Sequence, residues 1–231
     1  MREDGATVTT AVLFDAGGTL VHVDYFFLQH ELRRMGVRVT RRALRQAEYR
    51  ARAEIDRAVL GTAQGSDETR RRPYFAAMLE QFVPDVRALA HLLERLEAAH
   101  RQSNLWRLMF PSTRQVLAAL RRRGLTLGVV SNSDGRIAAI LRQCGAASFF
   151  DVVVDSHMVG VEKPDPRIFR LALAQAGARP EQAVYVGDIY GIDVVGAQRA
   201  GLRPLLLDAL GCYEGVRCEK IRHLRELLAR V

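Results

Sequence analysis

Short apolar runs alternate with helix-like stretches along most of the chain. The runs are rich in valine or leucine, which is typical of strands that are buried on both faces of a sheet. The stretches between them show helical periodicity, and most end at a glycine. Because strand and helix alternate, we expect an α/β fold with a doubly wound parallel sheet. The apolar runs are residues 11–14, 125–130, 149–155, 183–188 and 204–208, and the helix-like stretches are residues 112–123, 136–144, 165–176 and 194–200.

Residues 23–105 break this alternation and show mostly helical periodicity. We expect them to form a helical bundle inserted after the first strand, so that residues 1–22 and 106–231 make up the α/β core domain. The polar, glycine-containing stretch 61–72 is interpreted as a loop between bundle helices. The helices of the bundle are expected at residues 26–35, 41–60, 74–82 and 86–100.

The composition is that of an ordinary globular protein, with 48% hydrophobic residues in 231 and a net charge of +8. Arginine carries nearly all of the positive charge, because Lys163 and Lys220 are the only lysines. No aromatic residues interleave the arginine triplets, so we interpret these as solvated helix faces and expect no nucleic-acid partner. No apolar stretch is long enough to span a membrane, and the N-terminus does not resemble a signal peptide. The three cysteines form no C-x-x-C pair. We therefore expect a cytoplasmic protein without disulfides or zinc.

Polar side chains follow three of the predicted strands at the point where each strand ends. A lysine lies in the loop after another predicted strand, residues 149–155. Ligands of open parallel sheets bind beyond the carboxyl ends of the strands, so these side chains are expected to share one site. Any one of them alone would be an ordinary turn or helix-capping residue. The residues are Asp15, Ser131, Asn132, Lys163, Asp188 and Asp193.

The segments FDAGGTL, VVSNSDG, EKPDP and VGDIYGID resemble, in this order, the four motifs of the haloacid dehalogenase-like (HAD) hydrolase superfamily. The helical insertion is similar to the cap domain that one subgroup carries between the first and second motifs. The resemblance implies that Asp15 is the nucleophile and that the cofactor is Mg²⁺. It assigns Asp15, Asp188 and the carbonyl of Gly17 to the ion as direct ligands, with Asp193 holding its water.

Elementary chemistry supports such a site. A carboxylate can attack phosphorus and form an aspartyl-phosphate, provided that a cation separates the two anions. Carboxylate oxygens suit Mg²⁺, and Lys163 can offset the remaining negative charge. The positive field of the protein would favour a small anionic, phosphorylated metabolite as substrate.

Five residues are candidates for holding the phosphate or the nucleophile. Backbone amides near Gly17 and Gly18 can form an anion-binding nest, although glycine is equally at home in any tight turn. Ser131 and Asn132 can donate hydrogen bonds to a phosphate, and Ser131 could instead cap the following helix. Thr19 would orient the carboxylate of Asp15, although a β-branched residue near a strand end needs no such role.

Gly17 departs from the pattern of most HAD phosphatases, which have a general-acid aspartate two residues after the nucleophile. General acid catalysis typically contributes ~10²–10⁴ in rate, so its loss would slow the reaction without abolishing it. Acyl and aryl phosphates would suffer least, because their leaving groups barely need protonation. The sequence does not indicate which residue would replace the acid, and Tyr25, Arg52 and Tyr74 in the insertion are as compatible with packing as with specificity.

Two alternatives remain. A 2-haloacid dehalogenase also lacks the second aspartate, but it needs no metal and so gives no reason for Asp188 and Asp193. A catalytically weak binding or scaffold protein would explain Gly17, but not why the other site residues are present. A phosphonate hydrolase that uses a cap lysine is excluded, since no lysine precedes Lys163.

Overall fold

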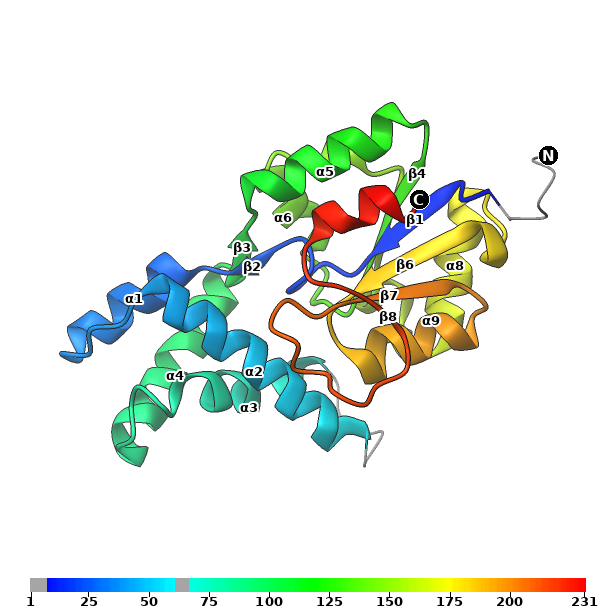
Figure 1. Cartoon of the computed structure of the whole chain (residues 1–231). Coiled ribbons are helices and arrows are strands. Elements are labelled where there is room, and N and C mark those ends of the chain that lie inside the picture. Colours follow the sequence, from blue (N-terminus) through cyan, green and yellow to red (C-terminus); the bar gives the residue numbers. More distant parts are fainter. Residues whose placement is uncertain (1–7, 61–66) are drawn as a thin grey trace.

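A six-stranded parallel sheet forms the centre of the protein in the computed structural model, which describes residues 8–60 and 67–231 (Figure 1). The strand order β5-β4-β1-β6-β7-β8 places β1 in the interior, paired with β4 and β6. This arrangement confirms the predicted doubly wound α/β fold. The strands are β1 (Ala11–Phe14), β4 (Thr126–Ser131), β5 (Val152–Asp155), β6 (Ala183–Gly187), β7 (Arg203–Leu207) and β8 (Glu219–Ile221).

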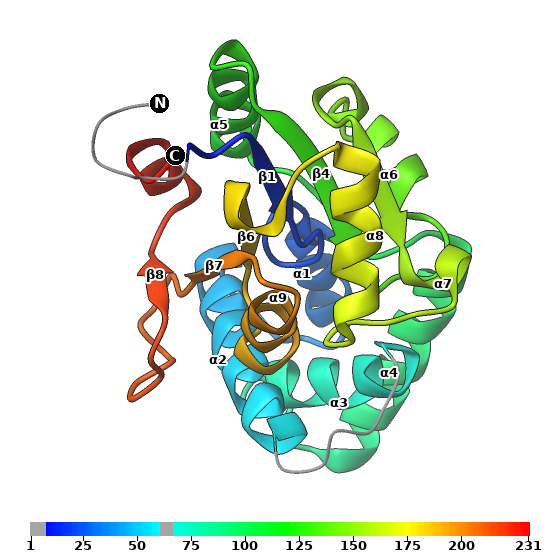
Figure 2. The same ribbon diagram turned by 90° about the vertical axis from the view of Figure 1, so that its right-hand side faces the viewer.

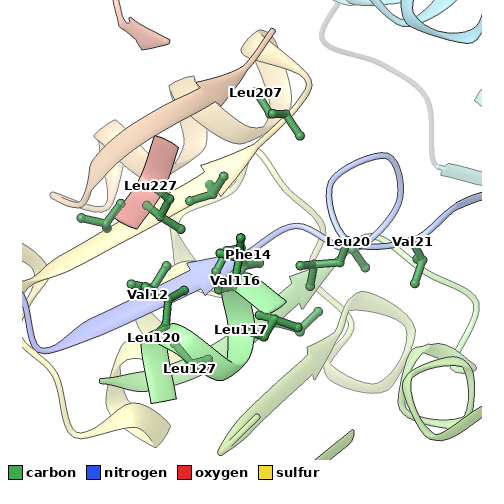
Figure 3. Packing of buried hydrophobic residues seen from close by; sticks show 14 of the residues in the cluster. Val12, Phe14, Leu20, Val21, Val116, Leu117, Leu120, Leu127, Leu207 and Leu227 are labelled. Carbon is green, nitrogen blue, oxygen red and sulfur yellow. The ribbon is translucent and has the colours of Figure 1, made fainter. Parts of the chain in front are cut away.

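Alternate residues of β1 supply two separate hydrophobic cores. Val12 and Phe14 face one side of the sheet, where they pack with α5, α6 and the 3-10 helix η4 (Figure 3). Leu13 faces the other side, where α8 and α9 cover the sheet (Figure 2). Every residue of β1 is buried, which explains its continuous apolar run. The covering elements are α5 (Pro111–Arg122), α6 (Ile137–Gln143), α8 (Pro166–Ala176), α9 (Val195–Arg199) and η4 (Leu224–Ala229).

Helix α8 illustrates how local sequence sets an element. Asp165 caps its N-terminus by accepting a hydrogen bond from the amide of Arg167, and Pro166 occupies the first turn, where no amide donor is needed. Gly177 ends the helix in the left-handed conformation, with φ of 61°. Short elements join the longer ones: η1 (Ala147–Phe149), α7 (Ser156–Val159), η2 (Pro180–Gln182) and the π-helical turn η3 (Tyr190–Val194).

The helical insertion, as we name α1–α4, packs as a bundle beside the carboxyl ends of the strands (Figure 1). Its core is a separate apolar cluster that includes Leu28, Leu44, Phe75 and Leu92. The antiparallel pair β2 (His22–Val23) and β3 (Trp106–Leu108) connects it to the sheet. Its helices are α1 (Tyr25–Arg34), α2 (Arg41–Leu60), α3 (Asp67–Leu79) and α4 (Val86–Gln102). None of the described helices has the length and apolar character needed to cross a bilayer.

Two features of this arrangement differ from the sequence prediction. Helix α3 begins at Asp67, so the prediction of a loop up to residue 72 was wrong for its second half, while residues 61–66 lie outside the described residues. The stretch 67–72 lacks glycine and is rich in arginine, a good helix former, and Pro73 removes only one hydrogen bond. Strand β8 was not predicted, because it is a short edge strand with two charged residues.

Candidate active site

A pocket lies beyond the carboxyl ends of β1, β4 and β6, between the sheet and the helical insertion. Its cavity measures about 120 Å³. Asp15, Gly17, Ser131, Lys163 and Asp188 line it. Asn132 and Asp193 line it too, so the structure brings together residues from all four motif segments.

Three buried carboxylates converge in this pocket. Asp15 directly follows β1 and Asp188 directly follows β6, while Asp193 lies in η3. One oxygen from each carboxyl group lies within 4.8 Å of the other two. The π-helical turn brings Asp193 back toward the end of β6, where its Oδ2 accepts hydrogen bonds from the amides of Asp188 (3.1 Å) and Ile189 (3.0 Å).

Lys163 connects two of these carboxylates. Its Nζ lies 2.6 Å from Oδ1 of Asp15 and 2.7 Å from Oδ1 of Asp193, and it also donates to the hydroxyl of Tyr185 at 3.0 Å. Lys163 is only 3% exposed, so this ammonium is held inside the site rather than in solvent. Tyr185 was not predicted to belong to the site, because it lies within an apolar run that is typical of a buried strand.

The loop after Asp15 is shaped by close contacts. Gly18 has φ of +93°, and a Cβ atom there would lie 2.5 Å from Oδ2 of Asp188. Only glycine fits this position. The amide of Gly18 donates to the carbonyl of Val21 at 2.6 Å, so Gly18 does not offer the free amide expected for phosphate. The amides of Ala16 and Gly17, and the carbonyl of Gly17, form no hydrogen bond with other described residues.

Thr19 was expected to orient the carboxylate of Asp15, but in the structure it contacts a different aspartate. Its hydroxyl donates to Oδ1 of Asp188 at 3.1 Å, so it holds the carboxylate of Asp188 rather than that of Asp15. The reason is that the loop turns sharply at Gly18, which directs the Thr19 side chain toward the end of β6.

Ser131 and Asn132 take different positions at the end of β4. Ser131 does not cap the following helix, because α6 begins at Ile137. The side-chain amide of Asn132 instead brackets the backbone of Lys163, accepting from its amide at 2.8 Å and donating to its carbonyl at 3.0 Å. Asn132 thereby positions the lysine, and one amide proton remains for a ligand.

The helical insertion contributes a buried arginine that sequence reasoning left without a role. Arg52 of α2 is 3% exposed, and its NH1 lies 3.0 Å from Oδ2 of Asp188 and 3.1 Å from the carbonyl of Gly18. Its NH2 lies 2.5 Å from Glu48, which the hydroxyls of Tyr25 and Tyr74 also contact. A signal was available: Leu44, Glu48, Arg52 and Asp56 recur every four residues along one buried face of α2.

A second polar group forms the far wall of the pocket. His100 of α4 places its Nε2 3.2 Å from Oδ2 of Asp134 and 3.3 Å from Arg71. Its Nδ1 accepts from the amide of Leu105, which leaves Nε2 to carry the proton of the neutral ring. The rings of His100 and Trp106 lie 5.8 Å apart. The insertion thus faces the acidic centre with both charged and aromatic side chains.

Burial dominates the electrostatics of the centre. It raises the pKa of Asp15 well above its usual range, with Lys163 acting in the opposite direction. It also raises the pKa of Asp188 to about 6, opposed by Arg52. The pKa of Lys163 is raised despite its burial, because the carboxylates of Asp15 and Asp193 favour its charged form. Each ionised carboxylate in this pocket therefore depends on a cation beside it.

The donor set fits a hard divalent cation. Oδ2 of Asp188 is buried without a hydrogen bond, even though Arg52 forms an ion pair with it. Among the described residues, the buried cations beside these three carboxylates are Lys163 and Arg52. Arg52 also pairs with the buried Glu48, so the centre retains net negative charge when all of these groups are ionised. Oxygen ligands of this kind suit Mg²⁺. The residues that would hold it are Asp15 and Asp188, with Gly17 and Asp193 beside them.

Comparison with known proteins agrees with this geometry. A model of haloacid dehalogenase-like hydrolases matches residues 9–201. The chain belongs to this HAD family. The family that this model describes consists of hydrolases.

Three relatives illustrate the similarity. Haloacid dehalogenase-like hydrolase domain-containing protein 3 of Mus musculus is 39% identical over 125 residues, which cover 54% of this chain and 49% of that protein. Phosphoserine phosphatase of Thermus thermophilus is 40% identical over 119 residues, covering 50% and 46%. The crystal structure of a HAD phosphatase from Thermococcus onnurineus is 26% identical, with a TM-score of 0.60 and coverage of 96% and 97%. The chain spans about half the length of the curated relatives it matches.

Proposed function

We propose that this HAD hydrolase is a Mg²⁺-dependent phosphatase that acts on a small phosphorylated metabolite through an aspartyl-phosphate. The observation that carries the proposal is the convergence of Asp15, Asp188 and Asp193 around Lys163 at the carboxyl edge of the sheet. The phosphatase names of two relatives support it. When bound, Mg²⁺ would neutralise both the nucleophile and the phosphate.

In the proposed first step, an oxygen of Asp15 attacks phosphorus and the bond to the leaving oxygen breaks. Lys163 holds the attacking carboxylate and offsets its charge. The backbone amides of Ala16 and Gly17, together with Ser131 and Asn132, are the available donors for the transferring phosphoryl group. In the second step water attacks phosphorus, which releases inorganic phosphate and regenerates the carboxylate of Asp15.

Gly17 leaves the departing oxygen without the usual acid, so we propose a preference for substrates whose leaving groups are stable as anions. A Cβ atom at Gly17 would lie 3.4 Å from Cδ1 of Trp106, an ordinary contact. A residue with a Cβ atom at this position therefore does not require Trp106 to move.

We further propose that residues 1–22 and 106–231 act as the catalytic core and residues 23–105 as a cap. The cap would exclude water and select the substrate through side chains such as Arg71, Tyr74 and His100.

Phosphate release from acetyl phosphate and an aryl phosphate tests the reaction. We expect release with Mg²⁺ and none with excess chelator, and we expect Asp15→Asn to abolish it while the fold and its circular dichroism are retained. Arg87→Gln, an exposed change on α4, serves as the control variant. Equal activity in Asp15→Asn and wild type would exclude the scheme. Halide release from 2-haloacids in chelator would favour a dehalogenase instead.

A further inference from the structure

A second and larger cavity, of about 590 Å³, lies on the other side of Thr19 from the active site. Three parts of the chain enclose it. The insertion contributes Arg45 and Tyr49, the β2–β3 connection contributes His22 and the adjoining Phe110, and the C-terminal segment after β8 contributes residues 222–226. The cavity therefore spans the junction at which the helical insertion meets the core. Thr19 belongs to both regions, since it lines this cavity and donates to Asp188.

The cavity is rich in unpaired positive charge. Arg45, Arg222 and Arg225 line it, and none of them forms an ion pair within the described part of the chain. Glu226 is the single carboxylate among the lining residues, and its Oε1 is occupied by the amides of Arg222 and His223. Three guanidinium groups facing one engaged carboxylate leave a net positive site that favours an anion.

Neutral donors complete this site. Helix α5 begins at the cavity, and its N-cap residue, Phe110, supplies no side-chain hydrogen bond. Pro111 has no amide hydrogen and the amide of Thr113 donates to the carbonyl of Phe110 at 3.0 Å, so Ser112 has the free amide of this turn among the described residues. Ser112 lines the cavity at this helix end. His22 is only 3% exposed, and its Nδ1 has no hydrogen-bond partner within residues 8–60 and 67–231. A buried ring nitrogen without a partner is costly, and a ligand in the cavity would satisfy it.

We propose that this cavity is a binding site for a phosphate-bearing small anion that bridges the insertion and the core. Arg45 would hold the ligand from the insertion side, and Arg222 and Arg225 from the core side. The amide of Ser112 and the ring of His22 would donate the remaining hydrogen bonds. The volume is within the range of pockets for small metabolites, ~300–1,000 Å³. The site is separate from the catalytic pocket, and it does not depend on the reaction proposed above.

A ligand that bridges the two parts would stabilise their present arrangement. Its phosphate group could belong to inorganic phosphate, to pyrophosphate or to an organic phosphate, and all three share the chemistry that the arginines recognise. Thr19 lines the cavity and donates a hydrogen bond to Asp188, so a ligand bound in the cavity is expected to affect the catalytic centre as well.

Isothermal titration calorimetry with pyrophosphate in divalent-free buffer tests the proposal, with inorganic phosphate as a parallel probe. We expect wild type and Asp15→Asn to bind pyrophosphate equally. In the double variant Arg45→Gln/Arg222→Gln, affinity should fall roughly tenfold for each guanidinium removed. The double variant Arg87→Gln/Arg199→Gln carries the same charge change at exposed positions outside the cavity and should bind as wild type does.

Trp106, the only tryptophan, provides a second measurement because it lies in the β2–β3 connection beside the catalytic pocket. Pyrophosphate should change its fluorescence in wild type and not in Arg45→Gln/Arg222→Gln. Without metal the carboxylates of the catalytic pocket repel an anion, so tighter binding in Asp15→Asn than in wild type would place the probe in that pocket and overturn the proposal. Equal weakening in both double variants, or no binding heat in wild type at millimolar probe, would overturn it as well.

Discussion

The substitution Asp56→Asn should remove a loss of stability that wild type undergoes as the pH rises from about 5 to neutral. Asp56 lies on α2 of the insertion and is fully buried. Its Oδ1 accepts from the amide of Gly191 at 2.8 Å, but its Oδ2 has no hydrogen bond. Burial raises the pKa of this carboxyl group from 3.8 to about 6, so ionisation costs more in the folded protein than in the unfolded chain. Asparagine keeps an oxygen that can accept from Gly191 and removes the charge.

The magnitude follows from the pKa difference. A rise from 3.8 to about 6 corresponds to roughly 3 kcal/mol at about 1.36 kcal/mol per pH unit. Because the folded pKa is the higher one, the stability of wild type falls as pH rises through this interval and levels off above it. Of the total, about 1.4 kcal/mol should be lost between about pH 5 and pH 7.5. The cost of the unpaired amide in the variant is constant with pH and does not affect this slope.

Urea denaturation across this pH range, followed by circular dichroism, measures the effect. The quantity to follow is the free energy of unfolding of Asp56→Asn minus that of wild type. It should increase by about 1.4 kcal/mol between about pH 5 and pH 7.5. The contributions of titratable groups that both proteins share cancel in this difference. Arg87→Gln, an exposed change on α4, serves again as the control variant. A flat difference for Asp56→Asn would refute the reasoning that burial destabilises its charge.

Three further changes test the catalytic centre. Lys163→Met leaves two buried carboxylates without their cation, so turnover should vanish and the metal-free protein should lose roughly 3–5 kcal/mol of stability; an unchanged urea midpoint would contradict this. A Cβ atom at position 17 makes only an ordinary contact with Trp106, so Gly17→Asp should raise turnover more for alkyl than for aryl phosphates if the missing acid limits the rate; an equal effect on both would mean that another group already protonates the leaving oxygen. Thr19→Val removes the hydrogen bond to Asp188 and should weaken Mg²⁺ binding about tenfold by calorimetry, whereas unchanged affinity would show that the hydroxyl does not orient this carboxylate.

The sequence predicted the central part of the fold and the convergence of the motif residues because both depend on chain geometry. A buried parallel strand needs a continuous apolar run, and side chains that follow such strands meet at one edge of the sheet. This is why the positions of Asp15, Lys163 and Asp188 could be anticipated. Strand β8 escaped prediction because a short edge strand carries no such pattern.

The contacts made by the insertion could not be predicted in the same way. Arg52 reaches Asp188 only through the packing of α2 against the end of the sheet, which no local pattern specifies. The turn at Gly18 likewise directs Thr19 to Asp188 instead of Asp15. The spacing of four residues that places Glu48 and Arg52 on the same helix face as Leu44 was the one signal in the sequence. Contacts that depend on tertiary packing could therefore not be predicted from the sequence.

Chemical trapping of the covalent intermediate tests the central claim most directly. Borohydride added during turnover of acetyl phosphate with Mg²⁺ would reduce an aspartyl-phosphate to homoserine, and peptide mass spectrometry would locate the change. The account predicts homoserine at position 15, dependent on both substrate and Mg²⁺. Continued turnover with Asp15 unmodified, or homoserine at another aspartate, would contradict it.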